Sequence, residues 1–508
     1  MRKWVSRAGM RAGLGLACLG AVTSSAEASA PFTEKEAKRA LRAVERVDES
    51  GAPKLEPTIA LRDLALALPE LDGAAEHRAK RVLSRPPDGT GEASGRWPAD
   101  ADEQTVETPA FIVHYALVPG CVAADENCDE PDLTDNDANG IPDYVDAAVE
   151  AVDRSIQVEN GELGWPEPKG DGDDGEPQGG PEKDRVDIYL SDLCGGNNCV
   201  FGYAQVDDNS SECINPPYLC SAYLVVDNDY AEFGASGGEL GLRVTTAHEY
   251  NHILQFNLDT NQDSWMFEST ATWAEEQVFP DDDDWVRSYM ASWVTETEIP
   301  LTKSDFKFYG SAIWNHWIEN GDSTYGPDVV LDAWELSRNV TPKDDAVASY
   351  DQAIEDNGGE SFFDEFVRFT SATAEWNAGV GNLPDHEKDP EGDHLPNVPR
   401  EGGLTLGKEP KMVTLDNTSF ELFDVNPKGA DEVRFKVRAD GDVRWGLSLV
   451  GRVGGRFDGT VERLQEYRGY GTRGSISLPD IDQFDRLTAI VTNADDRQDN
   501  KEFRLKIR

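Results

Sequence analysis

Two stretches near the middle of the chain carry apolar residues at helical spacing. In residues 240–254 the apolar side chains recur every three or four positions, which fits one face of a helix better than a strand. These positions are Leu240, Val244, Ala247, Ile253 and Leu254. In residues 265–276, aromatic and small apolar residues surround Glu268, which predicts a second and largely buried helix. A further helix is predicted for residues 306–318.

Strand patterns lie on both sides of these helices. Residues 108–117 alternate between the two faces of a strand, and residues 185–190 and 221–226 are short runs that predict strands. Because these strands come before the helices, the sequence predicts an α+β domain with a mixed sheet followed by helices. From Met412 onward, six short alternating runs are separated by turn residues, which predicts an all-β sandwich in residues 405–508.

The chain has 508 residues, which is too long for one hydrophobic core and predicts several domains. Residues 1–30 have the basic start, short apolar run and small-residue end of a secretory signal peptide. Residues 31–100 predict a helical leader, either a propeptide or a small packing domain. Residues 101–395 form the predicted α+β domain, and residues 378–410, which are rich in Gly, Pro, Asp and Asn, predict a linker toward the C-terminal part. No later apolar run is long enough to span a bilayer, so we expect no membrane insertion.

Six cysteines follow the predicted signal peptide and lie in three close pairs. The pairs are Cys121 with Cys128, Cys194 with Cys199, and Cys213 with Cys220. An even number of cysteines in an exported chain predicts disulfide bonds, and local pairing is the simplest of the possible arrangements. A cysteine zinc site is the less favoured alternative, because no C-x-x-C spacing occurs. We therefore expect a secreted protein, extracellular or periplasmic.

The net charge of −50 is concentrated in one part of the chain. Residues 101–404 contain 13 basic and 65 acidic side chains, whereas the flanking parts are close to neutral. Such a negative field repels nucleic acid and anionic surfaces, so we expect no nucleic-acid partner. The same field favours bound cations or basic substrates, although solubility alone explains it equally well.

The predicted helix at residues 240–254 contains the motif H-E-x-x-H. Residues four apart lie one above the other on a helix, so His248 and His252 can present two imidazole nitrogens to one metal ion. Zinc suits two imidazoles with one further ligand and an open position. Glu249 stands beside the first histidine and can act as a general base on a water molecule at that position. The alternative interpretation is two ordinary histidines on a half-buried helix face.

The second predicted helix supplies a candidate third ligand. Fifteen residues separate His252 from Glu268, which is enough for a turn and a helix that runs back past the first. A buried carboxylate is unfavourable unless it is paired or bound to a metal. The sequence therefore predicts a zinc site formed by His248, His252 and Glu268. A helix cap or a salt bridge is the alternative role for Glu268.

Together these motifs resemble those of the gluzincin metallopeptidases, in which H-E-x-x-H lies on one helix and a glutamate on the next helix is the third ligand. The run Trp265-Met266-Phe267-Glu268-Ser269-Thr270-Ala271 is similar to the W-L-N-E-G-F-A run of the aminopeptidase branch. The spacing to Glu268 is shorter than in that branch, and its G-A-M-E-N motif is absent. The chain is also similar to secreted bacterial metalloproteases with an H-E-Y-x-H motif. The resemblance implies a zincin-like fold for residues 101–395 and a zinc-dependent peptidase activity.

The same resemblance extends loosely to the next predicted helix. Residues 306–318 resemble the Y-x-K-G segment of the aminopeptidase branch, whose tyrosine stabilises the oxyanion of the tetrahedral intermediate. The resemblance therefore implies this role for Tyr309. His316 is seven residues later on the same predicted helix face and is the alternative donor. Its neighbours Trp314 and Trp317 favour packing instead.

An acidic loop stands before a helix predicted for residues 144–156. Residues 135–146 fit the calcium-loop pattern, with acids or amides at positions 1, 3, 5 and 9, glycine at 6 and a carbonyl at 7. The predicted ligands are Asp135, Asp137, Asn139, Ile141, Asp143 and Asp146. Position 12 is an aspartate rather than the usual glutamate, and an ordinary acidic turn is the alternative.

The leading hypothesis is a secreted zinc-dependent endopeptidase that acts on protein or peptide substrates and also binds calcium. Glu249 would take a proton from the attacking water and pass it to the leaving amine. The alternative hypothesis is a non-catalytic, calcium-dependent extracellular binding or surface protein that retains the zincin fold. The intact Glu249 favours the enzyme, because a scaffold needs only the metal ligands.

Overall fold

The fold is that of a computed structural model of the chain, and it is a mixed α and β architecture with several sheets. The described residues are 32–47, 56–88, 96–121, 128–171, 185–195, 198–207, 210–282, 284–320, 325–338, 345–374, 376, 397–441, 443–453, 456–457 and 473–508. The predicted signal peptide, residues 1–30, and most of the predicted linker lie outside the described residues.

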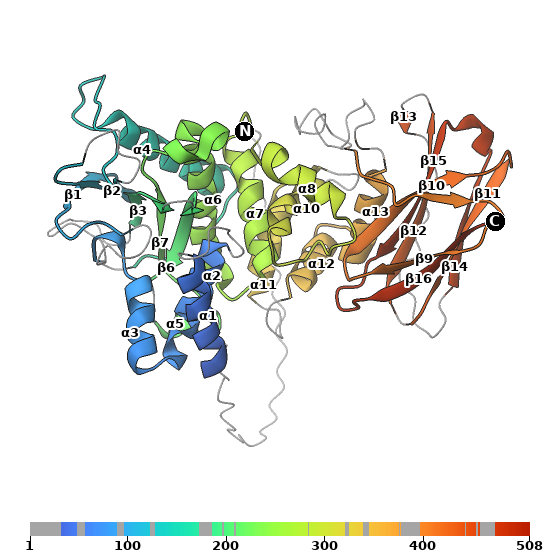
Figure 1. The fold of residues 1–508 in the computed structure, drawn as a ribbon, viewed down its shortest axis with the longest axis horizontal. Coiled ribbons are helices and arrows are strands. Elements are labelled where there is room, and N and C mark those ends of the chain that lie inside the picture. Colours follow the sequence, from blue (N-terminus) through green and yellow to red (C-terminus); the bar gives the residue numbers. More distant parts are fainter. Residues whose placement is uncertain are drawn as a thin grey trace, which may run out of the picture.

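A five-stranded sheet organises the N-terminal part of the molecule (Figure 1). The strands are β1 (Asp102–Glu107), β2 (Phe111–Leu117), β3 (Val186–Ser191), β6 (Gly202–Val206) and β7 (Ala222–Asp227). Their order is β1-β2-β3-β7-β6, with β2, β3 and β7 parallel and the two edge strands antiparallel to their neighbours. The sequence predicted the three central strands and missed both edges. β1 is polar and largely exposed, and β6 begins with a glycine, so neither carries a clear apolar pattern.

Helices cover both faces of this sheet (Figure 1). Ile188 and Leu190 of β3 join the core shared with α4 (Asp143–Ile156) and α6 (Gly238–Asp259). Tyr189, between them, joins a second core formed with the leader. A strand that is buried on both faces does not alternate between apolar and polar residues, which explains the continuous apolar run of β7.

The predicted leader folds into three helices that pack on this second face of the sheet. They are α1 (Glu34–Val47), α2 (Pro57–Ala67) and α3 (Gly73–Val82). The N-terminus of α1 is stabilised by reciprocal contacts, because Thr33 N donates to Glu36 Oε2 at 2.8 Å and Glu36 N donates to Thr33 Oγ1 at 3.4 Å. The helical prediction for the leader is confirmed for these residues.

Two buried helices follow the last strand of the sheet. α7 (Ser264–Val278) runs back beside α6, so that His248 lies opposite Glu275 and Gln255 lies opposite Phe267. Shorter helices complete this part: α5 (Ser211–Ile214), α8 (Ala291–Thr295), α9 (Lys307–Gly310), α10 (Ala312–Asn320), α11 (Asp328–Ser337), α12 (Ala346–Asp356) and α13 (Phe362–Ala372).

The C-terminal part consists of two sheets that share one hydrophobic core (Figure 1). The strands are β8 (Gly403–Thr405), β9 (Lys411–Leu415), β10 (Ser419–Asn426), β11 (Glu432–Ala439), β12 (Trp445–Val453), β13 (Arg456–Phe457), β14 (Arg473–Pro479), β15 (Arg486–Asn493) and β16 (Lys501–Ile507). One sheet has the order β13-β12-β15-β10-β8 and the other β14-β11-β16-β9. All six predicted runs are strands, and the first strand begins at Gly403, two residues before the predicted boundary.

The three predicted disulfide bonds are present with the local pairing. The bond between Cys194 and Cys199 joins the short strands β4 (Cys194–Gly195) and β5 (Asn198–Cys199). Disulfide bonds persist in oxidising compartments, which agrees with the predicted secretion. Among the described helices, none combines the length and apolar character that crossing a bilayer requires.

Candidate metal centre

The two histidines of H-E-x-x-H lie in the buried middle of α6. The exposed fractions of His248 and His252 are 7% and 0%, and their ring centroids are 4.7 Å apart. Their four-residue spacing places both rings on the helix face that is covered by α7. The Nε2 atoms of both rings are directed toward Glu268 of that helix.

Glu268 is completely buried between the two rings. Its Oε2 atom is 3.3 Å from His248 Nε2, and its Oε1 atom is 3.6 Å from His252 Nε2. Ligand atoms of all three residues lie within 4.8 Å of one another. The structure therefore brings the three residues predicted as zinc ligands together.

This donor set fits a tetrahedral zinc ion. Zinc bonds of about 2.0–2.1 Å at tetrahedral angles place neighbouring ligand atoms roughly 3.3 Å apart. The separations of 3.3 and 3.6 Å are close to that value. His252 Nε2 and Glu268 Oε1 are buried and have no hydrogen-bond partner. Such atoms are rare in proteins, and a cation between them would satisfy both.

The electrostatics of the cluster also favour a cation. Burial raises the pKa of Glu268, but the His252 and His248 rings outweigh this effect and lower the pKa to about 2. Burial lowers the pKa of His248, but hydrogen bonds to Glu268 and Glu275 outweigh it and hold the pKa well above its ordinary value. Carboxylates that stabilise positive charge on an imidazole can stabilise a bound dication in the same place.

Hydrogen bonds on the far side of each ring fix its orientation. His248 Nδ1 is 2.7 Å from Glu275 Oε1, and His252 Nδ1 is 2.8 Å from Gln255 Oε1. These acceptors hold a proton on Nδ1, which leaves the Nε2 lone pairs for a metal. Gln255 is itself positioned by its 2.6 Å hydrogen bond to Asn251 Oδ1.

Glu249 lies at the edge of the cluster beside β6 and is 4% exposed. Burial raises the pKa of Glu249 above its ordinary value against the opposing effect of the two histidines, which suits a general base. A Cβ atom added at Gly202 would lie 2.5 Å from Thr245 Cγ2 and 3.2 Å from Glu249 Cγ. Gly202 therefore allows β6 to approach the helix that carries Glu249.

Tyr309 lies beside the cluster, but the predicted helix around it is divided. The helix is interrupted at Ser311, which separates α9 from α10, so Tyr309 and His316 do not share one helix. The Tyr309 ring is half-buried, and its centroid is 5.9 Å from that of His248. The His316 ring stacks on Trp285 at 4.7 Å. These contacts favour Tyr309 as the donor near the site and a packing role for His316.

The predicted calcium loop runs into the first turn of α4, which contains Asp143 and Asp146. Five of the six predicted ligands contribute side chains to one cluster: Asp135, Asp137, Asn139, Asp143 and Asp146. Carboxylate oxygens of Asp135, Asp137 and Asp143 lie within 4.8 Å of one another. Gly140 has a φ of 94°, a left-handed conformation that turns the loop back on itself. Calcium ligation by these side chains and by the Ile141 carbonyl stays a prediction.

Local sequence patterns did not indicate all of the residues around the metal centre. A polar residue three positions after a ligand on a buried helix is a signal that could have revealed Gln255. Gly202 and Thr58 gave no such signal, because they approach Glu249 from other elements. Thr58 Oγ1 donates to Glu249 Oε2 at 3.0 Å across 191 positions of sequence.

Comparisons with known proteins identify no family for the chain. No protein-family model matches it, and no curated protein matches it. One matching solved structure is a family GH115 4-O-methyl-α-glucuronidase with specificity for decorated arabinogalactans, at 11% identity and a TM-score of 0.14. The match covers 56% of this chain and 46% of the glucuronidase chain, so it spans less than half of that enzyme.

Proposed function

We propose that the protein is a zinc-dependent peptidase of the gluzincin type, acting on protein or peptide substrates. The observation that carries the proposal is the buried cluster of His248, His252 and Glu268, with nitrogen-to-oxygen separations of 3.3 and 3.6 Å. The adjacent Glu249 supports an enzyme rather than a metal-stabilised scaffold, because only catalysis needs a base there.

The proposal includes the architecture and the compartment. The sheet followed by buried helices supports a zincin-like domain in residues 101–395, and the two sheets with a common core support a β-sandwich in residues 405–508. Three disulfide bonds support export, for which residues 1–30 would be the signal peptide. Calcium bound by residues 135–146 would stabilise the fold.

The residues of the centre have distinct roles in peptide hydrolysis. The three ligands would hold zinc, which when bound polarises a carbonyl group and lowers the pKa of a water molecule to about 7. Glu249 accepts a proton from the attacking water and delivers it to the leaving amine. Tyr309 donates a hydrogen bond to the developing oxyanion. Glu275 and Gln255 keep the two imidazole rings in orientation.

The proposed activity is tested by casein digestion with the secreted protein, with its zinc content measured in parallel. We expect hydrolysis that a chelator abolishes and that added zinc restores. Secreted protein that contains zinc and no longer carries its leader, yet leaves casein and unstructured peptides intact, would instead support the non-catalytic alternative.

Replacing Tyr309 with phenylalanine should lower kcat and leave folding and zinc content unchanged. The substitution keeps the ring that stacks on Tyr289 at 4.7 Å and removes only the hydroxyl group. One oxyanion donor typically contributes roughly a hundredfold to turnover, so a loss of that size is expected. Steady-state kinetics with a fluorogenic peptide measures it.

The comparison variant is His316→Ala, which should lower the melting temperature because it removes a ring stacked on Trp285. Normal turnover in Tyr309→Phe, together with lost turnover in a well-folded His316→Ala variant, would transfer the donor role to His316.

Calcium should raise the melting temperature of the protein, and Asp135→Ala should remove that increase. A ligand that binds the native state stabilises it by mass action, and Asp135 supplies position 1 of the loop. Calorimetry with and without calcium measures the effect. Glu150→Ala is the matched control, since it removes one negative charge from the exposed face of α4, outside the loop. An unchanged calcium response in Asp135→Ala would exclude this loop as the site.

A further inference from the structure

The leader helix α2 reaches into the neighbourhood of the metal centre. It packs against β6, the edge strand that lies next to Glu249. Ile59 of α2 belongs to the main core, whereas Ala60 and Leu64 belong to the core of the leader. The N-terminal turn of α2 is therefore buried inside the molecule rather than exposed on its surface.

Thr58 engages two groups that a peptide substrate would need. Its hydroxyl donates to Glu249 Oε2 at 3.0 Å and accepts from the backbone N–H of Ala204 at 2.9 Å. Ala204 belongs to β6, an edge strand of the described sheet. Extended peptides bind to sheet edges through such amide groups. Catalysis by Glu249 also requires that its carboxylate be free to reach water.

Glu56 adds a third carboxyl group to this region. It is 4% exposed, and it caps α2 by accepting from Thr58 N at 2.9 Å and Ile59 N at 2.6 Å. Burial, and then the charges of Glu268 and Glu249, raise the pKa of Glu56 well above its ordinary value. A dication at the centre would offset this repulsion.

We propose that residues 56–88 are a built-in inhibitor that occupies the edge of β6 and the carboxylate of Glu249 until the leader is displaced. The inference rests on the proposed function and adds its regulation. It also assigns a substrate class, because the edge that Thr58 covers would pair with an extended peptide. The leader and the substrate compete for the same backbone amide and the same base.

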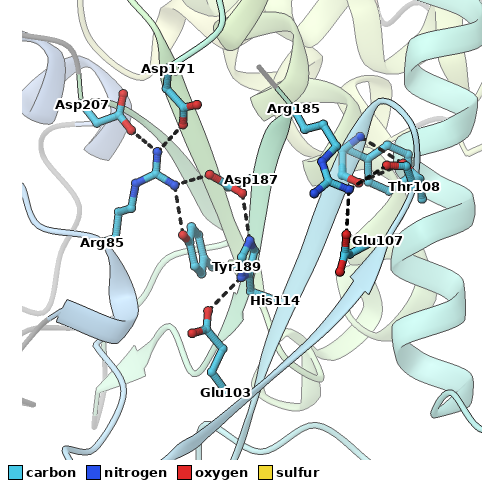
Figure 2. A network of polar contacts seen from close by, with 11 residues as sticks. Arg85, Glu103, Glu107, Thr108, His114, Asp171, Arg185, Asp187, Tyr189 and Asp207 are labelled. Carbon is cyan, nitrogen blue, oxygen red and sulfur yellow. Dashed lines mark hydrogen bonds and ion pairs between the residues drawn. The ribbon is translucent and has the colours of Figure 1, made fainter. Parts of the chain in front are cut away.

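A buried ion-pair network anchors the far end of this segment (Figure 2). Arg85 follows α3 and inserts its guanidinium group among side chains that lie outside the leader. Its partners are Asp171, Asp187, Asp207 and Tyr189. His114 Nε2 holds the other oxygen of Asp187 at 2.9 Å. Removing one partner of such a buried network is strongly unfavourable, so these contacts keep the leader docked on the sheet.

Arg62 provides a second attachment, on α2 itself. It donates to the carbonyl oxygen of Gln262 at 3.0 Å and to Ser264 Oγ at 3.2 Å, at the turn between α6 and α7. Its guanidinium carbon is 4.8 Å from the centroid of the Phe267 ring. The helix that covers Glu249 is thus attached to the two helices that carry the ligands.

The test uses the full-length chain loaded with cobalt and titrated with a peptide hydroxamate, which binds an open metal position and changes the visible spectrum. Wild-type protein should bind the probe weakly. Arg85→Gln should bind it at least about tenfold more tightly. Loss of a buried ion-pair partner favours the state in which the leader has moved away from β6 and Glu249. Casein hydrolysis by the zinc form should rise in parallel.

Arg78→Gln is the matched control, because it removes the same charge from the leader at a pair with Glu45 that lies within the leader itself. It should behave as wild type. Arg62→Gln is a second test variant, which keeps the test valid if Arg85→Gln does not fold. In either test variant, hydrogen exchange of the Ala204 amide should be faster than in the control.

Equal probe affinity in wild type, Arg85→Gln and Arg62→Gln would overturn the inhibitory role and leave the proposed peptidase function intact. A folded chain that takes up no cobalt or zinc would instead contradict the metal centre itself, and with it the inhibitor. Probe binding that increases in Arg62→Gln and Arg85→Gln, and not in Arg78→Gln, supports the proposal.

Discussion

Glu268→Ala is expected to abolish stoichiometric zinc binding and, with it, peptide hydrolysis. Glu268 places one oxygen near each imidazole, at 3.3 Å from His248 Nε2 and 3.6 Å from His252 Nε2. Alanine removes both oxygens and leaves two neutral donors, which is too few for a stable zinc site. The zinc affinity should fall by more than the roughly tenfold to hundredfold loss that is typical when a residue hydrogen-bonded to a metal ligand is replaced. Zinc titration with a competing chromophoric chelator measures the change.

A graded comparison separates ligation from general disturbance of the helix. Glu275→Gln changes the residue two helical turns further along α7. It keeps an oxygen that can accept from His248 Nδ1, which is 2.7 Å from Glu275 Oε1 in the native chain. The variant should reduce zinc affinity by at most about a hundredfold, because Glu275 contacts the ligand His248 rather than the metal position. His248→Ala should match the loss in Glu268→Ala. Full zinc affinity in Glu268→Ala would show that Glu268 is not the third ligand.

The sequence predicted the ligand cluster because each part of it has a local signal. His248 and His252 are four residues apart, which fixes their common face as soon as the segment is helical. Glu268 stands in a run of residues that only a buried helix would contain, so its carboxylate needed a partner. Local pairing of the cysteines and the strands after Met412 were predictable for the same reason, since short-range spacing determines them.

The residues that the sequence did not reveal depend on contacts between distant segments. Thr58 meets Glu249 because the leader packs on the second face of the sheet, and no periodicity in residues 31–100 specifies that docking. β6 was missed because an edge strand that starts at Gly202 has no sustained apolar pattern. The break at Ser311 depends on tertiary contacts, among them its hydrogen bond to the Leu301 carbonyl at 2.9 Å.

Glu249→Gln should retain zinc and lose most of its hydrolytic activity. Glu249 Oε2 accepts a hydrogen bond from Thr58 Oγ1 at 3.0 Å, and the ion pairs of the cluster join His248 and His252 to Glu268 rather than to Glu249. Glutamine has nearly the same shape and can still accept from Thr58, but its amide cannot take a proton from water at neutral pH. A positioned general base contributes roughly a hundredfold to ten-thousandfold, so kcat should fall by about a thousandfold.

Metal analysis and kinetics on the same preparation distinguish this outcome from a structural failure. Zinc content, melting temperature and hydroxamate affinity should equal those of the wild type, because the substitution leaves the three ligands in place. Glu249→Asp is the informative companion, since it retains a base on a shorter side chain and should recover part of the lost turnover. If Glu249→Gln hydrolyses peptides at the wild-type rate with zinc bound, another group must accept the proton.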